Sequence, residues 1–188
     1  MMDQLFPFET ARLRIRKLRL EDVGAFHAYR RLPQVCQYQG FYPMDEQACA
    51  AFIEEQLPLT LGKPGQWVQY GLEVRATGQL VGDCALRQKE EEPRIGEIGI
   101  SLSPAVQGQG YAREAMLGLM GILFDQLQVR RIEELTDAEN LASVRMLESL
   151  GFRREAHFIE NVFFKGKWGS EFIYAMLKRE WETLKGHL

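Results

Sequence analysis

The sequence has 188 residues, of which 46% are apolar and 26% are charged, and its formal net charge is −3. A chain of this length and composition is expected to fold as a single domain, residues 1–188, with a core of its own. A mildly acidic chain lacks the basic face that nucleic-acid binding requires, although an average over the surface leaves a local basic patch open. We therefore expect no nucleic-acid partner.

The cysteines and the N-terminus indicate the compartment. Cys36, Cys49 and Cys84 are odd in number and lack CxxC spacing, which favours reduced thiols over a disulfide or metal framework. The start, "MMDQLFPFETARLRI", shows no signal-peptide pattern, and the apolar stretch "AMLGLMGILF" is too short to span a bilayer. We expect a cytoplasmic protein with no metal and no membrane partner.

The first half of the chain reads as a strand, two helices and three strands. "ARLRIRKL" (11–18) alternates apolar and basic residues, the pattern of a half-buried strand. Helices are predicted within 19–32 and 44–59, the second with Asp45 as N-cap and Pro58 limiting its end. Segments 67–75 and 78–87 predict a hairpin that turns at "ATG", and 94–104 predicts a further strand.

The second half predicts a helix, a strand, a helix and a final pair of strands. After "QGQG", the residues Met116, Leu119, Met120 and Leu123 fall on one helical face. A weaker strand pattern covers 130–138, and the helix that follows ends before a glycine in "NLASVRMLESLGF". Segments 155–164 and 171–181 should pair around the turn "KGKWGS". This order predicts a mixed α/β sheet with helices on its faces.

The stretch "LSPAVQGQGYAREAM" leaves a strand, exposes two glycines and starts a helix within a few residues. Arg113 stands where a dinucleotide fingerprint needs its third glycine, and no Gly-Lys-Ser/Thr ending marks a Walker loop. Bare amides at the positive end of a helix still suit a phosphate. The residues alone leave two readings: an anion site, or a surface turn without a function.

A resemblance narrows this choice. "QGQGYA" is similar to the Q/R-x-x-G-x-G/A signature of the GNAT superfamily of acetyl-CoA-dependent N-acetyltransferases, and "NLASVRMLESLGF" resembles its N-x-x-S-x-x-x-L-x-x-x-G-F segment. Both ends of the chain, "ETARLRIRKLRLEDV" and "GFRREAHFIENVFFKGKWGSEFIYAMLKREW", resemble the branch that includes the ribosomal-protein N-terminal acetyltransferases (the Rim-type branch), although Ala156, Ser170 and Glu171 depart from its pattern. The resemblance implies a mixed, mostly antiparallel central sheet flanked by helices on both faces and splayed between its fourth and fifth strands.

The resemblance also implies roles for individual residues. Main-chain amides of the glycine stretch would hold the coenzyme A pyrophosphate, and the splayed strand and Asn140 would contact the pantetheine arm. Ser143 would also contact the departing thiolate, as an acid or a hydrogen-bond donor. The residues implied in coenzyme binding are Ile100, Leu102, Gln107, Gly108, Gln109, Gly110, Tyr111, Ala112, Asn140 and Ser143.

Acetyl transfer needs an amine with a free lone pair. A lysine with a pKa of ~10.4 is neutral only ~0.04% of the time at pH 7, whereas an α-amine with a pKa of ~7.7–8.0 is ~10–15% neutral. Glu97, on the strand before the glycine stretch, is the first candidate for a general base, followed by Glu73 and Glu160. None of the cysteines stands in a setting that favours a thiolate, so we expect direct attack by the amine rather than a covalent enzyme intermediate.

The acceptor should bind between the first two helices and the last hairpin. Its predicted contacts are Tyr38, Glu160, Phe164 and Trp168, although aromatic residues at such spacings also serve in cores. We therefore predict an N-acetyltransferase that moves an acetyl group from acetyl-CoA to a primary amine, on a small molecule or a protein N-terminus. The alternatives are a non-catalytic acetyl-CoA-binding regulatory module and a phosphate-binding domain for another nucleotide. The chain could act as a monomer or a homodimer.

Overall fold

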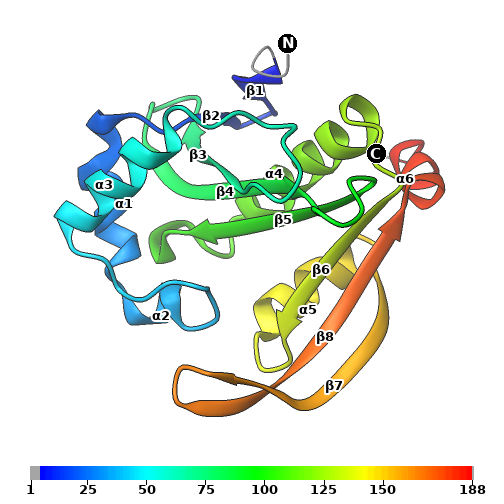
Figure 1. The fold of residues 1–188 in the computed structure, drawn as a ribbon. Coiled ribbons are helices and arrows are strands. Elements are labelled where there is room, and N and C mark those ends of the chain that lie inside the picture. The colour runs from blue at the N-terminus through cyan, green and yellow to red at the C-terminus, as the bar shows by residue number, and fades with distance from the viewer. Residues whose placement is uncertain (1–4, 188) are drawn as a thin grey trace.

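The computed structural model describes residues 5–187, which form one eight-stranded sheet with helices on both faces (Figure 1). The elements in the first half are β1 (Phe8–Glu9), β2 (Leu13–Lys17), α1 (Val23–Arg30), α2 (Pro33–Cys36), α3 (Glu46–Gln56), β3 (Val68–Val74), β4 (Leu80–Gln88) and β5 (Ile95–Leu102). Those in the second half are α4 (Tyr111–Gly121), β6 (Arg131–Asp137), α5 (Leu141–Ser149), β7 (Arg153–Phe164), β8 (Lys167–Leu177) and α6 (Lys178–Lys185).

The predicted α/β order is confirmed, with three short elements added and two boundaries corrected. The short β1, the single-turn α2 and the C-terminal α6 were not predicted. The predicted strand 171–181 ends at Leu177, because Glu180 accepts the Leu177 amide (2.8 Å) and starts a helix there. The predicted turn 165–170 is shorter than expected: Lys165 and Gly166, both with positive φ, reverse the chain as a two-residue hairpin turn.

The sheet has the strand order β1-β2-β3-β4-β5-β6-β8-β7, and only β5 and β6 are parallel. These two strands pair at just two positions, Ile95 with Arg131 and Gly96 with Ile132. Beyond them the strands diverge, which leaves a wedge-shaped gap in the sheet (Figure 1). This confirms the expected splay between the fourth and fifth predicted strands, here β5 and β6. We call the paired end of the gap its vertex.

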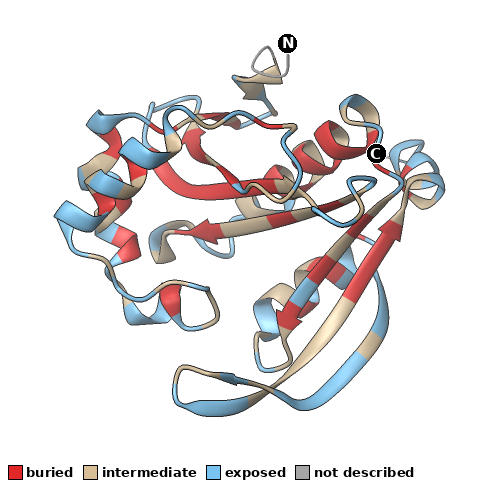
Figure 2. Ribbon diagram, viewed as in Figure 1, coloured by how far each residue is buried: buried red, intermediate tan, exposed pale blue. Residues whose placement is uncertain are grey.

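Two hydrophobic clusters hold the sheet from opposite faces. The larger one joins β2–β6 to α4 and α5 and includes Met116, Leu119 and Phe124. The smaller one lies under α1 and α3 around Phe26 and Ile53. Figure 2 shows buried residues concentrated along β3–β5 and α4, whereas the far end of the β7–β8 hairpin is exposed. The sheet is therefore most firmly packed next to the gap.

The sheet also buries charged groups in closed networks. Asp83 of β4 accepts hydrogen bonds from Arg30, Tyr29 and Gln69. Glu73 of β3 is bound by Arg14 and Arg16. Glu73, the second candidate base, therefore belongs to a structural ion-pair network, and β4 and β5 lie between its strand and the gap. Within residues 5–187, no helix is long and apolar enough to cross a membrane.

Candidate functional site

The glycine stretch connects the end of β5 to the start of α4 and presents bare backbone amides. Gly108 (φ 76°) and Gly110 (φ 82°, the N-cap of α4) adopt a left-handed conformation that suits glycine. Among the hydrogen bonds of the described residues, none uses the amide of any residue from Gly108 to Ala112 as a donor to a protein acceptor. A helix N-terminus with free amides in this arrangement can bind an anion.

The first β-hairpin fixes this loop in place. Arg12 donates to the Gln109 carbonyl (2.9 Å) and lies over the Tyr111 ring at 4.4 Å. Its guanidinium and its amide also bind Glu114, in the first turn of α4, at 2.6 Å each. Sequence reasoning did not assign Arg12 a role, because the contact joins residues far apart in the chain.

A cavity of about 590 Å³ opens beside the loop. Of the ten residues implied in coenzyme binding, nine line it: Ile100, Leu102, Gln107, Gly108, Gly110, Tyr111, Ala112, Asn140 and Ser143. The tenth, Gln109, turns its side chain to the Ala105 carbonyl instead. Arg113 and Arg145 also line the cavity, and neither forms an ion pair with another described residue. The cavity therefore offers bare amides and two unpaired cations to a polyphosphate.

The gap between β5 and β6 exposes the backbone of β5. The Ile98 amide points across the gap to β6, so alternation along a strand turns the amides of Ile100 and Leu102 the same way. Two glutamine side chains close part of this edge. Gln39 donates to the Ile100 carbonyl (3.4 Å), and Gln107 donates to the Leu102 carbonyl (3.1 Å). The Ile100 amide faces the gap, where it can donate a hydrogen bond to the carbonyl oxygen of a ligand.

Asn140 and Ser143 lie at the start of α5, opposite that edge. Asn140 caps the helix, because its side-chain oxygen accepts the Ser143 amide at 3.2 Å. This capping leaves the Asn140 side-chain NH₂ and the Ser143 hydroxyl without a protein partner among the described residues. Both residues line the cavity, so both polar groups are available to a ligand.

A second cavity, of about 350 Å³, continues from the first into the gap. The two cavities share Tyr38, Gln39, Ile100, Asn140, Ser143 and Met146. Three carboxyl groups line the second one, those of Glu134, Asp137 and Glu171, and none of its lining residues is a lysine, arginine or histidine. We call this second cavity the chamber. Its carboxyl groups favour a cationic ligand over an anionic one.

Glu134 was not predicted, and it is the most deeply buried of the three carboxyl groups. Its side chain reaches from β6 into the gap, where Oε1 accepts the Ile98 amide at 2.9 Å. The residue is 8% exposed, and this burial raises the pKa of its carboxyl group well above the usual range. The period-two pattern of the strand could have indicated that Glu134 is buried, since it falls on the same strand face as buried Ile132 and Thr136.

Glu97, the predicted base, lies beside the vertex but faces elsewhere. Its carboxylate forms an ion pair with Arg87 across β4 and β5 and lies 3.8 Å from Lys89. It is not among the residues that line either cavity. Burial raises the pKa of all three cysteine thiols, Cys36, Cys49 and Cys84, which disfavours a thiolate nucleophile at each.

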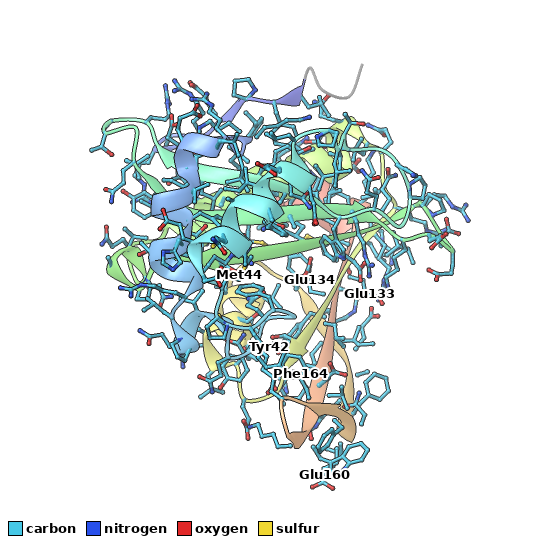
Figure 3. The ribbon with its side chains drawn as sticks, turned by 60° about the vertical axis from the view of Figure 1, so that its left-hand side comes forward. Tyr42, Met44, Glu133, Glu134, Glu160 and Phe164 are labelled. Atoms are coloured by element: carbon cyan, nitrogen blue, oxygen red, sulfur yellow. The ribbon has the colours of Figure 1, made fainter. Side chains whose placement is uncertain are left out.

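Two of the four predicted acceptor contacts line the chamber. Tyr38 and Phe164 do so, and the Tyr38 hydroxyl donates to the Glu139 carbonyl (3.3 Å). Trp168 packs against Phe163 on an exposed part of the hairpin, and it lines neither cavity. Glu160 lies within β7, where the pairing with β8 is irregular between Phe158 and Val162, and well away from Glu134 (Figure 3). The positions of Trp168 and Glu160 do not support the prediction that they contact an acceptor.

Comparison with known proteins agrees with this geometry. Residues 12–153 match the acetyltransferase (GNAT) domain family. The uncharacterized N-acetyltransferase p20 of Bacillus licheniformis is 30% identical over 172 residues, which are 92% of this chain and 96% of that protein. An acetyltransferase (GNAT family) from Bacillus anthracis has a crystal structure with a TM-score of 0.82 and 26% identity, over 92% of this chain and 98% of that one.

A third comparison is at the level of the fold. The spermidine N-acetyltransferase of Vibrio cholerae, crystallised in complex with CoA and spermine, has a TM-score of 0.77 and 20% identity. The match covers 92% of this chain and 99% of that one.

Proposed function

The chain belongs to the GNAT acetyltransferase family and is an N-acetyltransferase that uses acetyl-CoA, and on that premise we propose a direct transfer to a primary amine within a ternary complex. The observation that carries the proposal is the run of bare amides from Gly108 to Ala112, which opens onto a cavity that continues into the gap between β5 and β6. Acetyl-CoA supplies a thioester, whose carbonyl carbon the amine attacks.

Residues of this chain bind acetyl-CoA at two places, its negatively charged pyrophosphate and its backbone-like arm. The amides of the loop take the pyrophosphate, and Arg113 and Arg145 provide positive charge beside it. The arm bonds to the amides that β5 presents to the gap and to the Asn140 side chain. The thioester then lies in the gap, where the Ile100 amide stabilises negative charge on its oxygen and the Ser143 hydroxyl donates to the departing sulfur.

The amine enters the chamber that Tyr38 and Phe164 line, and its positive charge is matched by carboxylates there. We favour an α-amine as acceptor, since about 1–1.4 kcal/mol frees its lone pair at pH 7, against roughly 4.6 kcal/mol for a lysine amine. This choice agrees with the sequence resemblance of both chain ends to the ribosomal-protein N-terminal acetyltransferases. The Rim-type assignment is part of the proposal.

The test is a thiol-release assay with acetyl-CoA and a panel of amines, including peptide N-termini, polyamines and lysine side chains. We expect coenzyme A release with at least one amine, and a preference for α-amines near pH 7. Mass spectrometry of the products would identify the acetylated nitrogen. Tight binding of acetyl-CoA without acetylation of any amine would contradict the proposal and favour a regulatory coenzyme-binding module.

A further inference from the structure

The vertex of the gap holds a carboxyl group whose one structural role does not require an ionisable side chain. Glu134 lies where β5 and β6 stop pairing, and its Oε1 replaces the backbone acceptor that the Ile98 amide has lost. An uncharged polar residue could accept that one hydrogen bond equally well. Burying an ionisable group there costs free energy, so its presence suggests a chemical task.

The position of Glu134 relative to the donor narrows the task. In the proposed function the pyrophosphate binds beyond the C-terminal end of β5, so the arm of the donor would run back along β5 toward Ile98. The reacting end of the donor therefore approaches the vertex. Glu134 lines this part of the chamber together with Ile98, Gly99 and Ile100. It pairs with Tyr174 of β8, and Figure 3 shows it well apart from Glu160.

Of the other carboxyl groups nearby, two form ion pairs and two accept a single hydrogen bond each. Glu97 is paired with Arg87, and Glu133, on the opposite face of β6, is paired with Lys89 and Arg131. Asp137 accepts the Glu139 amide. Glu171, on β8, accepts the Asn161 side chain at 2.5 Å.

On Glu134, Oε2 has no protein partner among the described residues. Asp137 and Glu171 also keep one oxygen each, but both residues are only half-buried, whereas Glu134 is buried. The charged groups that bear on Glu134 are Glu97, Glu133 and, with opposite sign, Lys89.

On the basis of the proposed function, we propose that Glu134 is the proton acceptor of the reaction and takes a proton from the ammonium group of the bound amine. This step yields a neutral acid and a neutral amine. The nitrogen then bonds to the thioester carbon, the carbon–sulfur bond breaks with its electron pair on sulfur, and the nitrogen loses its surplus proton to water. The sulfur takes a proton from water, and Glu134 returns its own to water before the next turnover.

The buried setting suits this role. A carboxyl group whose pKa is raised toward that of an α-amine accepts its proton with less free-energy cost than an ordinary carboxylate does. The Ile98 amide holds Oε1 in both protonation states, so the free oxygen stays aimed into the chamber.

Glu134→Gln tests the role, because glutamine keeps the shape and can still accept the Ile98 amide. With an amine that the unaltered protein acetylates, we expect kcat/KM at pH 7 to fall about 100-fold or more. The deficit should shrink as the pH rises through the pKa of the amine, because the amine then loses its proton without help. Calorimetry should show unchanged acetyl-CoA affinity.

Glu133→Gln is the matched control, since it changes the neighbouring carboxylate on the opposite face of β6, and its kcat/KM should stay within about threefold of normal. A deficit in Glu134→Gln that is equal at every pH, or no deficit, would overturn the role. So would a pH-dependent deficit in Glu97→Gln alone. If the unaltered protein acetylates no amine at all, the proposed function fails and this role fails with it.

Discussion

At the scale of single residues, Glu134 connects stability with chemistry. Its carboxyl group is buried at the vertex of the gap and receives one hydrogen bond, from the Ile98 amide. Burial disfavours the charged form, so the folded protein holds the proton more tightly than the unfolded chain does. Such a residue lowers folding stability at neutral pH, which is a cost that functional sites commonly carry.

This cost predicts how the stability of Glu134→Gln depends on pH. Because the pKa of Glu134 is raised on folding, its carboxyl group favours the fold fully at acidic pH and loses that contribution as the pH rises toward the folded pKa. Glutamine does not titrate. The variant should therefore match the unaltered protein near pH 4 and become more stable above it, by up to about 1.4 kcal/mol per pH unit until the folded pKa is reached. Urea unfolding across pH 4–8 measures this difference.

Glu155, whose pKa is lowered rather than raised on folding, provides the control. Hydrogen bonds from Arg131 and Arg153 lower the pKa of Glu155 to about 2. Glu155→Gln should therefore reduce stability slightly at pH 7, with the loss shrinking as the pH falls toward 2. A Glu134→Gln difference that is constant with pH would mean that the Glu134 pKa is not raised on folding, and this would remove support for its role as a base.

Glu97 and Glu134 show how much of the candidate site could be predicted from the sequence at the scale of residues. Glu97 was a candidate because of its place on the strand before the glycine stretch. Its carboxylate is neutralised by Arg87 of the neighbouring strand, β4. That pairing depends on the register of β4 and β5, which a single sequence does not reveal. Glu134 lay on the buried face of a predicted strand, and a charged residue on such a face could have been noticed from the pattern alone.

At the scale of elements, the start of α4 depends on glycine backbone geometry. Gly110 has φ 82°, and a Cβ there would lie 3.4 Å from Arg12 Nη2. We predict that Gly110→Val strains the loop, moves Arg12 and turns the amides away from the pyrophosphate. Acetyl-CoA affinity should then fall at least 100-fold, because several hydrogen bonds to charged oxygens are lost. Calorimetry measures this affinity, and circular dichroism checks the fold.

Gly78→Val separates coenzyme loss from backbone strain. Gly78 also has positive φ (70°), its added Cβ would meet nothing within 4 Å, and it lies in the β3–β4 turn rather than at the cavity. Both variants should lose thermal stability, but only Gly110→Val should lose acetyl-CoA. Normal acetyl-CoA binding by Gly110→Val would show that the loop does not hold the pyrophosphate.

Elements with strong hydrophobic periodicity or clear capping and turn residues were predictable. Elements whose bounds depend on contacts with distant parts of the chain were not. The helix after the glycine stretch and the helix that Asn140 caps both follow from local residues. The start of α6 does not, because Leu177 carries no capping side chain of its own. Instead, Glu180 caps the helix and Trp181 packs on Phe124, a contact between segments far apart in the chain.

At the scale of the whole molecule, the gap divides the sheet into two parts. The vertex joins β1–β5 to β6–β8, and a second junction crosses the open side. There Lys165, at the tip of the β7–β8 hairpin, donates to the carbonyls of Cys36 and Phe41 (2.7 Å to Phe41) and lies 5.0 Å from the ring centroids of Tyr42 and Phe164. The hairpin and the segment after α2 thus close the chamber between them.

This junction predicts a selective loss of acceptor binding in Lys165→Met. Methionine keeps much of the length but cannot donate to the two carbonyls, so the segment 37–45 should move away from the hairpin. We expect the KM for the amine to rise about tenfold, equivalent to about 1.4 kcal/mol, and acetyl-CoA affinity to change little. Hydrogen exchange of the amides in 37–45 should quicken in the same variant. Lys167→Met, at the first residue of β8, removes only an exposed ion pair with Glu139 and should leave both measurements within error of the unaltered protein. Equal effects of the two variants on KM would place the acceptor away from this junction and reduce Lys165 to a surface contact.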